Sequence, residues 1–414
     1  MSEKNSSRRQ FLKGRSLLGK IREIAGAALD AAEENNRDLP PVDTSDVSAS
    51  GWPLLRFARK AMATDFEISF NRGQYPQAAE AAIAALDEVD RFESLLSVFQ
   101  EDSEVSHINS TAAENAVEPS VEVRDLLRQC DLLSQETNGA IDITASPLWR
   151  LWGFAKREGK VPAQEDIDAV RQHVGPSLVQ WDETSQSVRF AKPGVEISFG
   201  CIGKGTALDS AKRKLQELEI EHALLHGGRS SISALGGRIQ ESWPQSTQRS
   251  FPANVSGTLL EPTRDRSVGW TIGISHPLRP GQRLAEVRLT DESLGTSGSQ
   301  HQFFIHRGKR YGHIIDPRTG QPAQGMLMAT VIAPTAALAD AISTAFFVLD
   351  PNQTAEYCRN HPGIAALLVL PNVASEHVET EMSKNSSADN LSDNDCRVLH
   401  FGFEENQIRF FRRR

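Results

Sequence analysis

Two segments near the carboxyl-terminal end of the chain carry residues that could handle a phosphate group. The first covers residues 311–323 (YGHIIDPRTGQPA) and contains His313 and Asp316. The second reads ADAISTAFFVL and places Asp340 and Thr344 four residues apart, on one face of an expected helix. Carboxylate and hydroxyl oxygens are ligands that Mg²⁺ prefers, and a nearby histidine can move a proton at neutral pH. Together the two segments suggest a magnesium site that handles phosphate.

Each of these residues has a purely structural interpretation when it is taken alone. An Asp in the first turns of a helix, such as Asp340, is stabilised by the helix dipole. The Thr344 hydroxyl can bond back to a helix carbonyl, and His313 can be a hydrogen-bonded structural histidine. The functional interpretation therefore depends on which residues lie around them.

A glycine-rich loop forms a second candidate phosphate site. Residues 200–205 read GCIGKG, and they follow an expected strand and begin an expected helix. Backbone N–H groups at a helix N-terminus bind phosphate, glycine permits its close approach, and Lys204 adds a positive charge. The spacing is not that of a Walker A loop, so a tight structural turn is the alternative. The pair Gly227-Gly228, which follows an expected strand, has the same two interpretations.

Composition excludes several classes of protein. The 414 residues are 39% hydrophobic with a net charge of −9 and a pI near 5.7, which argues against a dedicated nucleic-acid binder. The four cysteines form no CxxC motif and have no zinc spacing. No apolar stretch is long enough to span a bilayer.

The N-terminal region is expected to be a leader and linker over residues 1–53. Residues 7–13 read SRRQFLK, which is similar to a twin-arginine export signal, but charged residues interrupt the apolar stretch that should follow. Localisation is therefore open: a periplasmic or inner-membrane-associated protein if the signal works, and a cytoplasmic one otherwise. The folded domain is expected over 54–414, with polar insertions near 237–266 and 372–395.

The remaining sequence predicts a mixture of helices and strands. Helical spacing of apolar residues predicts helices over 76–99, 121–138, 205–218 and 336–349, the last with Thr335 as its N-cap. Strands are expected over 65–70, 179–182, 187–191, 195–199, 270–275, 285–289, 303–306, 329–333 and 364–370, and a closing hairpin over 398–403 and 408–411. Without strict βαβ alternation, the fold class is α+β.

Nine segments of the chain, in order, resemble the ApbE-like FAD:protein FMN transferases, also called flavin transferases. They are KAMATDFEISF, FESLLSVFQEDSEVSHIN, GAIDITASPLWRLWGF, ISFGCIGKGTALD, ALLHGGRSSISALG, WTIGISHP, LGTSGSQHQFF, HIIDPRTGQPA and TVIAPTAALADAISTAFFVLD. The resemblance implies a T-fold-like α+β fold of mixed, mainly antiparallel sheets with packed helices. It also implies a Mg²⁺-dependent bacterial enzyme that moves FMN from its substrate FAD onto a threonine of a target protein and releases AMP.

The resemblance also implies roles for individual residues. His313 would act at the reacting end as a base or electrostatic partner. Mg²⁺ would be held by the backbone carbonyl of Cys201 and by Asp340 and Thr344, with Ser343 beside them. The FAD site would be formed by Met62, Phe99, Ala140, Ile141, Asp142, Ser198, Lys204 and Ile314.

Two positions depart from the family pattern. Ser198 and Arg229 each stand where the family usually has Asp. The missing carboxylate at Ser198 bears on how FAD is held, and the positive charge of Arg229, where the family has a negative one, bears on target recognition. The alternative function is a FAD-binding or FAD pyrophosphate-hydrolysing relative that has lost transfer. The expected partner is the acceptor protein, for which the resemblance suggests a subunit of a membrane redox complex. No nucleic acid is expected, and the oligomeric state is open.

Overall fold

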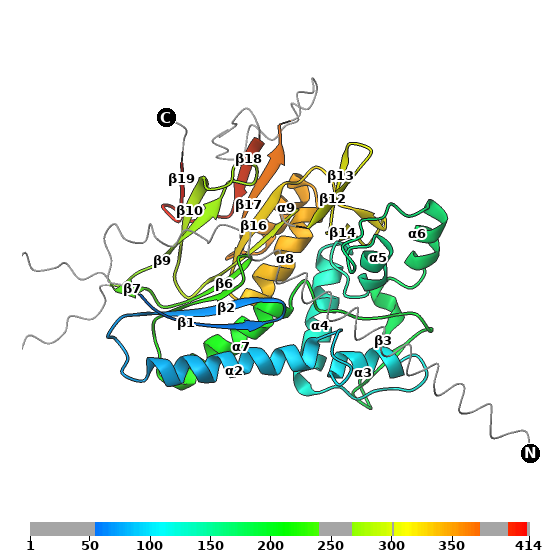
Figure 1. Ribbon diagram of the computed structural model, residues 1–414, viewed down its shortest axis with the longest axis horizontal. Helices are drawn as coiled ribbons and strands as arrows, with labels where there is room; N and C mark the ends of the chain where they lie inside the picture. The colour runs from blue at the N-terminus through cyan, green and yellow to red at the C-terminus, as the bar shows by residue number, and fades with distance from the viewer. Residues whose placement is uncertain (1–53, 240–266, 300–301, 373–395, 412–414) are drawn as a thin grey trace, which may run out of the picture.

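The computed structural model describes residues 54–239, 267–299, 302–372 and 396–411. Its largest element is an eight-stranded sheet in which every neighbouring pair is antiparallel (Figure 1). In spatial order the strands are β1 (Leu54–Ala61), β2 (Thr64–Asn71), β5 (Ala223–Gly227), β6 (Ser231–Leu235), β11 (Ser293–Gly298), β16 (Met328–Ala333), β17 (Ala365–Pro371) and β18 (Cys396–Phe401). The α+β fold with mainly antiparallel sheets is confirmed.

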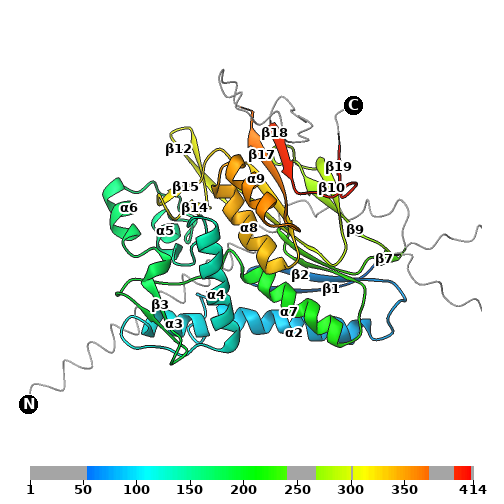
Figure 2. The same ribbon diagram turned by 180° about the vertical axis from the view of Figure 1, so that it is seen from behind.

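Helices cover one face of this sheet (Figure 2). They are α2 (Ala78–Leu96), α7 (Gly203–Glu217), α8 (Ala336–Val348) and α9 (Pro351–Asn360). Helix α8 begins as predicted, because the Thr335 hydroxyl accepts a hydrogen bond from the N–H of Leu338. The described part of the chain contains no helix that combines the length and hydropathy of a membrane span.

A three-stranded sheet packs on the opposite face. It consists of β9 (Trp270–Ser275), β10 (Arg283–Leu289) and β19 (Ile408–Phe410), in the order β19-β10-β9. Strand β17 shows why the main sheet is buried on both sides: Ala366 and Leu368 belong to the core under the helices, while Leu367 and Val369 belong to the core under the small sheet. A strand that is buried on both faces reads as a continuous apolar run.

Most of the remaining elements lie together at one end of the helical layer, on the right in Figure 1, whereas β7 lies at the other end. The helices are α3 (Glu104–Thr111), α4 (Val121–Glu136), α5 (Ser146–Leu151), α6 (Gln164–Arg171) and the 3₁₀ turn η2 (Pro176–Leu178). The short antiparallel pairs there are β3 (Val179–Asp182) with β4 (Ser187–Phe190), β12 (Phe303–His306) with β13 (Lys309–Gly312), and β14 (Ile315–Asp316) with β15 (Gln321–Pro322). A last pair joins β7 (Arg238–Ile239) and β8 (Ser267–Val268).

Two sequence-based expectations are wrong. Residues 195–199 do not form a strand, because their main chain bonds to a side chain: the N–H and C=O of Ile197 pair with the amide of Asn109 at 2.7 and 2.9 Å. The predicted closing hairpin does not form either. Strand β18 pairs with β17 in the main sheet, whereas β19 pairs with β10 in the small one. Each strand therefore extends an existing sheet.

Several strands were missed, and two of them position the site. Strands β6 and β11 present small residues to α8: SISAL alternates serine with apolar residues, and SLGTSG has no apolar pattern. A Cβ at Gly295 would lie 2.3 Å from the carbonyl oxygen of Ala339, so only glycine lets α8 come this close. Residues 1–53 and most of the predicted insertions at 237–266 and 372–395 lie outside the described residues.

Candidate functional site

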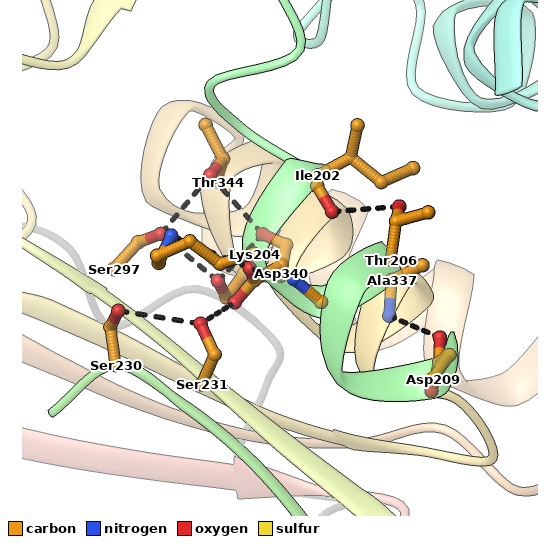
Figure 3. Close-up of polar contacts among 12 residues, drawn as sticks. Ile202, Lys204, Thr206, Asp209, Ser230, Ser231, Ser297, Ala337, Asp340 and Thr344 are labelled. Carbon is orange, nitrogen blue, oxygen red and sulfur yellow. Dashed lines mark hydrogen bonds and ion pairs between the residues drawn. The ribbon is translucent and has the colours of Figure 1, made fainter. Parts of the chain in front are cut away.

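The site is built where the first turns of α7 and α8 meet (Figure 3). A Cβ at Gly205 would lie 2.1 Å from the carbonyl oxygen of Ala336, which shows that the two helices touch through their backbones. Asp209, one turn further along α7, accepts hydrogen bonds from the N–H groups of Ala336 and Ala337 at 2.8 and 2.9 Å. This carboxylate satisfies N–H groups that have no partner within α8. Burial raises its pKa to about 6.

Asp340 is the buried carboxylate at the centre of this arrangement, with only 4% of its surface exposed. Its Oδ2 accepts the N–H of Gly205 at 2.9 Å and lies 3.4 Å from Nζ of Lys204. Its Oδ1 accepts a hydrogen bond from the hydroxyl of Ser231 on β6. Burial raises the pKa of Asp340, and the charge of Lys204 and these hydrogen bonds oppose that rise only in part. A further positive charge beside this carboxylate would therefore be favourable.

Hydroxyl groups from α8 and β11 form the neighbouring part of the site. Ser343 and Thr344 both donate to the carbonyl oxygen of Asp340, at 2.9 and 3.2 Å. The hydroxyl of Ser297 on β11 lies 2.9 Å from Oγ of Ser343 and 3.2 Å from Oγ1 of Thr344 (Figure 3). Four residues predicted from the sequence, Lys204, Asp340, Ser343 and Thr344, are thus brought together.

The donor set fits a hard cation and not a soft one. The described residues contain no group of three or more His, Cys, Asp or Glu side chains that could hold a metal. What they offer is one buried carboxylate, several hydroxyl groups and backbone carbonyls, which is oxygen chemistry suited to Mg²⁺ with substrate oxygens and water in the other positions. Cys201 is half-buried at the start of α7, and burial raises the pKa of its thiol to about 12, so the sulfur stays protonated and is a poor ligand.

Ser231, Ser297 and Asp209 were not predicted from the sequence. Ser231 lies in the run SISAL, whose alternation was the available signal of a strand, whereas Ser297 lies in SLGTSG, which has no apolar pattern. Asp209 lies four residues after Gly205, on the helix face that packs against α8, and that spacing was the available signal.

A second group of predicted residues lies around the loop that follows α4. Ala140 and Ile141 are each 2% exposed and pack in the main core. The Asp142 carboxylate accepts the N–H and the hydroxyl of Thr144 at 2.8 and 2.6 Å, and burial raises its pKa. The N–H of Ser198 donates to the carbonyl of Ile143 at 2.8 Å, which ties this loop to the segment that leads into α7.

Met62 and Phe99 occupy two further elements. Met62 and Ala63 form the two-residue turn between β1 and β2, with φ values of 49° and 57°. Both are left-handed, as a type I′ turn requires, although neither is glycine. The N–H of Met62 donates to Glu93 on α2 at 2.8 Å. Phe99 lies just beyond α2 and exposes 70% of its surface.

His313 follows the β12–β13 hairpin. Its main-chain N–H donates to the carbonyl of Gln302 at 3.1 Å, and its Nδ1 lies 3.2 Å from the same oxygen. A carbonyl only accepts, so Nδ1 carries the proton in this geometry and Nε2 carries the lone pair. The next residue, Ile314, is buried in the main core with Ala140 and Ile141.

The family model described as the ApbE family matches residues 62–368, which is most of the chain. The chain belongs to the ApbE family. This confirms the resemblance found in the nine segments. The match begins at Met62, in the turn between β1 and β2.

Known members of the ApbE family are similar to this chain in sequence and in fold. The FAD:protein FMN transferase of Haemophilus influenzae is 28% identical over 327 residues, covering 77% of this chain and 86% of that protein. The crystal structure of the ApbE protein of Thermotoga maritima matches with a TM-score of 0.65 at 28% identity, covering 77% of this chain and 94% of that one. The apo flavinyl transferase ApbE of Pseudomonas stutzeri, at 24% identity and a TM-score of 0.65, covers 84% and 95% and shares the fold.

The two departures from the ApbE pattern lie in different surroundings. Ser198 is half-buried beside the Asp142 loop, with its hydroxyl 3.7 Å from where a Cβ of Gly200 would be. Arg229 is exposed in the turn between β5 and β6. The preceding Gly228 has a φ of 67°, and a Cβ there would meet the hydroxyl of Thr64 at 2.5 Å. The Arg229 turn therefore lies against the β1–β2 turn that carries Met62.

Proposed function

We propose that this chain transfers FMN from FAD onto a threonine hydroxyl of a target protein and releases AMP. The family and its relatives confirm the transferase class that the sequence predicts. The more specific proposal rests on the surroundings of Asp340. Its buried carboxylate lies beside Lys204, the α7 N-terminus and a group of hydroxyls. Such a group can hold a pyrophosphate and a hard cation together.

The proposed reaction exchanges the phosphoanhydride bond of FAD for a phosphoester bond to threonine. The threonine oxygen bonds to the phosphorus of the FMN phosphate, the bond from that phosphorus to the bridging oxygen breaks, and AMP leaves with that oxygen. The threonine proton passes to a base. Such a transfer depends on positioning and on neutralising charge more than on covalent help from the protein.

His313 is the proposed base. Because Nδ1–H donates to Gln302, the Nε2 lone pair is the atom that takes the threonine proton. The bond to a main-chain carbonyl also fixes the ring orientation. Lys204, which lies 3.4 Å from Asp340, would hold negative charge on the phosphates.

Mg²⁺ would be held by Asp340, Thr344 and the backbone carbonyl of Cys201, with Ser343 and Ser297 beside them. When bound, the ion neutralises the charge that develops on the phosphate oxygens. The FAD-contacting set proposed from the family pattern is Met62, Phe99, Ala140, Ile141, Asp142, Ser198, Lys204 and Ile314. The exposed ring of Phe99 supports a stacking role against a flat flavin ring.

The acceptor is proposed to be a protein, and a subunit of a membrane redox complex is our candidate. Incubating the full chain with FAD, Mg²⁺ and host membrane proteins tests this. A fluorescent band on a denaturing gel, together with AMP, supports transfer. Release of AMP and FMN without a labelled band supports the hydrolysing relative instead, and the absence of AMP contradicts both. Export through the twin-arginine-like N-terminus is tested separately, by sequencing the N-terminus of the protein purified from its native host. A chain that begins after about residue 30 supports a cleaved export signal, and a chain that keeps those residues argues against it.

A further inference from the structure

The hairpin formed by β12 and β13 ends next to the proposed base, and β12 forms one of its two outer edges. Its four pairs run from His306↔Lys309 at the turn to Phe303↔Gly312 at the open end. Among the described residues, β12 pairs with β13 alone. The turn residues Arg307 and Gly308 have φ values of 51° and 77°, which is type I′ geometry. Because the pair that closes such a turn is hydrogen-bonded, the N–H and C=O groups of Ile305 and Phe303 point away from β13.

The side chains of β12 divide between the core and the solvent. Phe304 points inward, where it stacks on Tyr311 with ring centroids 5.2 Å apart and packs near Trp152. Phe303 and Ile305 remain 42% and 66% exposed. The two residues with outward-pointing backbone groups are thus also those with exposed apolar side chains. An exposed edge of this kind is a template for another strand.

The surroundings of this edge are strongly basic in a chain of net charge −9. Phe304 lies against Gly159, where a Cβ would meet the ring at 2.6 Å, so the loop after α5 adjoins the hairpin. Residues 151–160 and 302–313 carry one acidic side chain, Glu158. Their lysines and arginines are Lys156, Arg157, Lys160, Arg307, Lys309 and Arg310. An acidic segment would be attracted to this surface.

The open end of the hairpin leads into the site. Gln302, the residue before β12, holds both the main chain and the imidazole of His313 through its carbonyl. A strand lying along the outer edge of β12 therefore passes Gln302, whose carbonyl holds His313, as it leaves the hairpin.

We propose that the outer edge of β12 binds an extended, acidic segment of the acceptor protein as a third strand. Main-chain hydrogen bonds to Phe303 and Ile305 hold the segment, and the basic side chains around the hairpin select for acidic residues in it. The hydroxyl residue that is modified lies where the segment passes Gln302 and His313. This inference rests on the proposed function for the identity of the segment, but its binding test does not.

The test uses two fluorescein-labelled peptides and the full chain. One peptide alternates Glu and Val around a central threonine, and the other has Lys in place of Glu. Fluorescence anisotropy should show binding of the Glu peptide, weakening as salt is raised, and at least tenfold weaker binding of the Lys peptide. Equal affinity for the two peptides, or no binding of the Glu peptide, would overturn the proposal.

Variants distinguish binding at the β12 edge from nonspecific binding of the peptide. Ile305→Pro removes one outward N–H and should weaken binding of the Glu peptide at least tenfold, while Ile305→Thr keeps that N–H and should change it by no more than a few-fold. The double change Arg307→Glu with Lys309→Glu should weaken it at least tenfold. Binding that is unaffected by Ile305→Pro and by the double change contradicts the proposal. Covalent flavin on the peptide is scored separately, so a failure of transfer is distinguishable from a failure of docking.

Discussion

The N–H of Gly205 donates to Oδ2 of Asp340 over 2.9 Å, and this bond joins the first turn of α7 to the interior of α8. The two residues are 135 positions apart in the chain. The bond is possible because Gly205 has no side chain, which lets the backbones of the two helices touch. A carboxylate that is buried beside a lysine, as Asp340 is, is the group to which the proposed function assigns the cation.

Gly205→Ala should lower the free energy of unfolding by about 3 kcal/mol or more, because the added methyl group would collide with backbone atoms of α8 that cannot rotate away. Urea unfolding followed by circular dichroism measures the change. Gly200→Ala, in the same loop, is the matched control, since its Cβ would meet nothing closer than 3.7 Å. Similar stability of the two variants would show that the helices separate more easily than this packing implies.

Asp340→Asn should abolish Mg²⁺-dependent transfer, with a loss of about 100-fold or more, because the carboxylate charge is the group proposed to hold the ion. Without Mg²⁺ the variant should be at least as stable as the parent, since burial raises the pKa of Asp340 and its ionised form is a cost to the fold. Thermal melting and AMP release measure the two effects. Glu356→Gln, an exposed carboxylate on α9, is the control. Normal activity in Asp340→Asn would remove the metal assignment.

The pKa of Asp209 predicts a pH dependence of stability. The folded protein holds this proton more tightly than the unfolded chain does, because burial raises the pKa from 3.8 to about 6. The stabilising contribution is therefore complete below about pH 4 and is lost as pH rises through about 6, for a total on the order of 2–3 kcal/mol. Asp209→Asn should flatten the curve of unfolding free energy over this window. An unchanged slope in the variant would contradict the buried character of the carboxylate.

The turn that carries Met62 should become more stable with glycine at its second position. Ala63 adopts a φ of 57°, which costs an L-residue about 1 kcal/mol that glycine does not incur. Ala63→Gly should therefore raise the free energy of unfolding by up to about 1 kcal/mol. In contrast, Ala58→Gly in the middle of β1 should lower it by about 0.5–1 kcal/mol. The opposite signs are the diagnostic result, and a loss of stability in both variants would exclude the type I′ explanation.

His313→Ala should slow transfer by about 100-fold or more while FAD affinity stays within a few-fold, because the proposed role is proton transfer and not binding. Single-turnover labelling of the acceptor and quenching of flavin fluorescence on binding measure the two quantities. Loss of FAD binding would make His313 a substrate contact instead.

The elements with regular apolar spacing could be predicted from the sequence by itself. Helices α2, α4 and α8, the cap at Thr335, and strands β9, β10, β16 and β17 follow from local periodicity and capping chemistry, which depend on neighbouring residues. Asp340 and Thr344 were predicted as a pair for the same reason: a helix places residues four apart on one face.

What only the tertiary structure decided is what surrounds that pair. Strands β6 and β11 carry serine and glycine because α8 lies against them, and their own sequence contains no sign of that helix. The segment 195–199 has the composition of a strand, but its main chain bonds to the side chain of Asn109. Asp209 and Gly205 meet α8 across more than a hundred residues. Contacts of this kind depend on how close two elements can approach, and that distance is set by packing and not by local sequence.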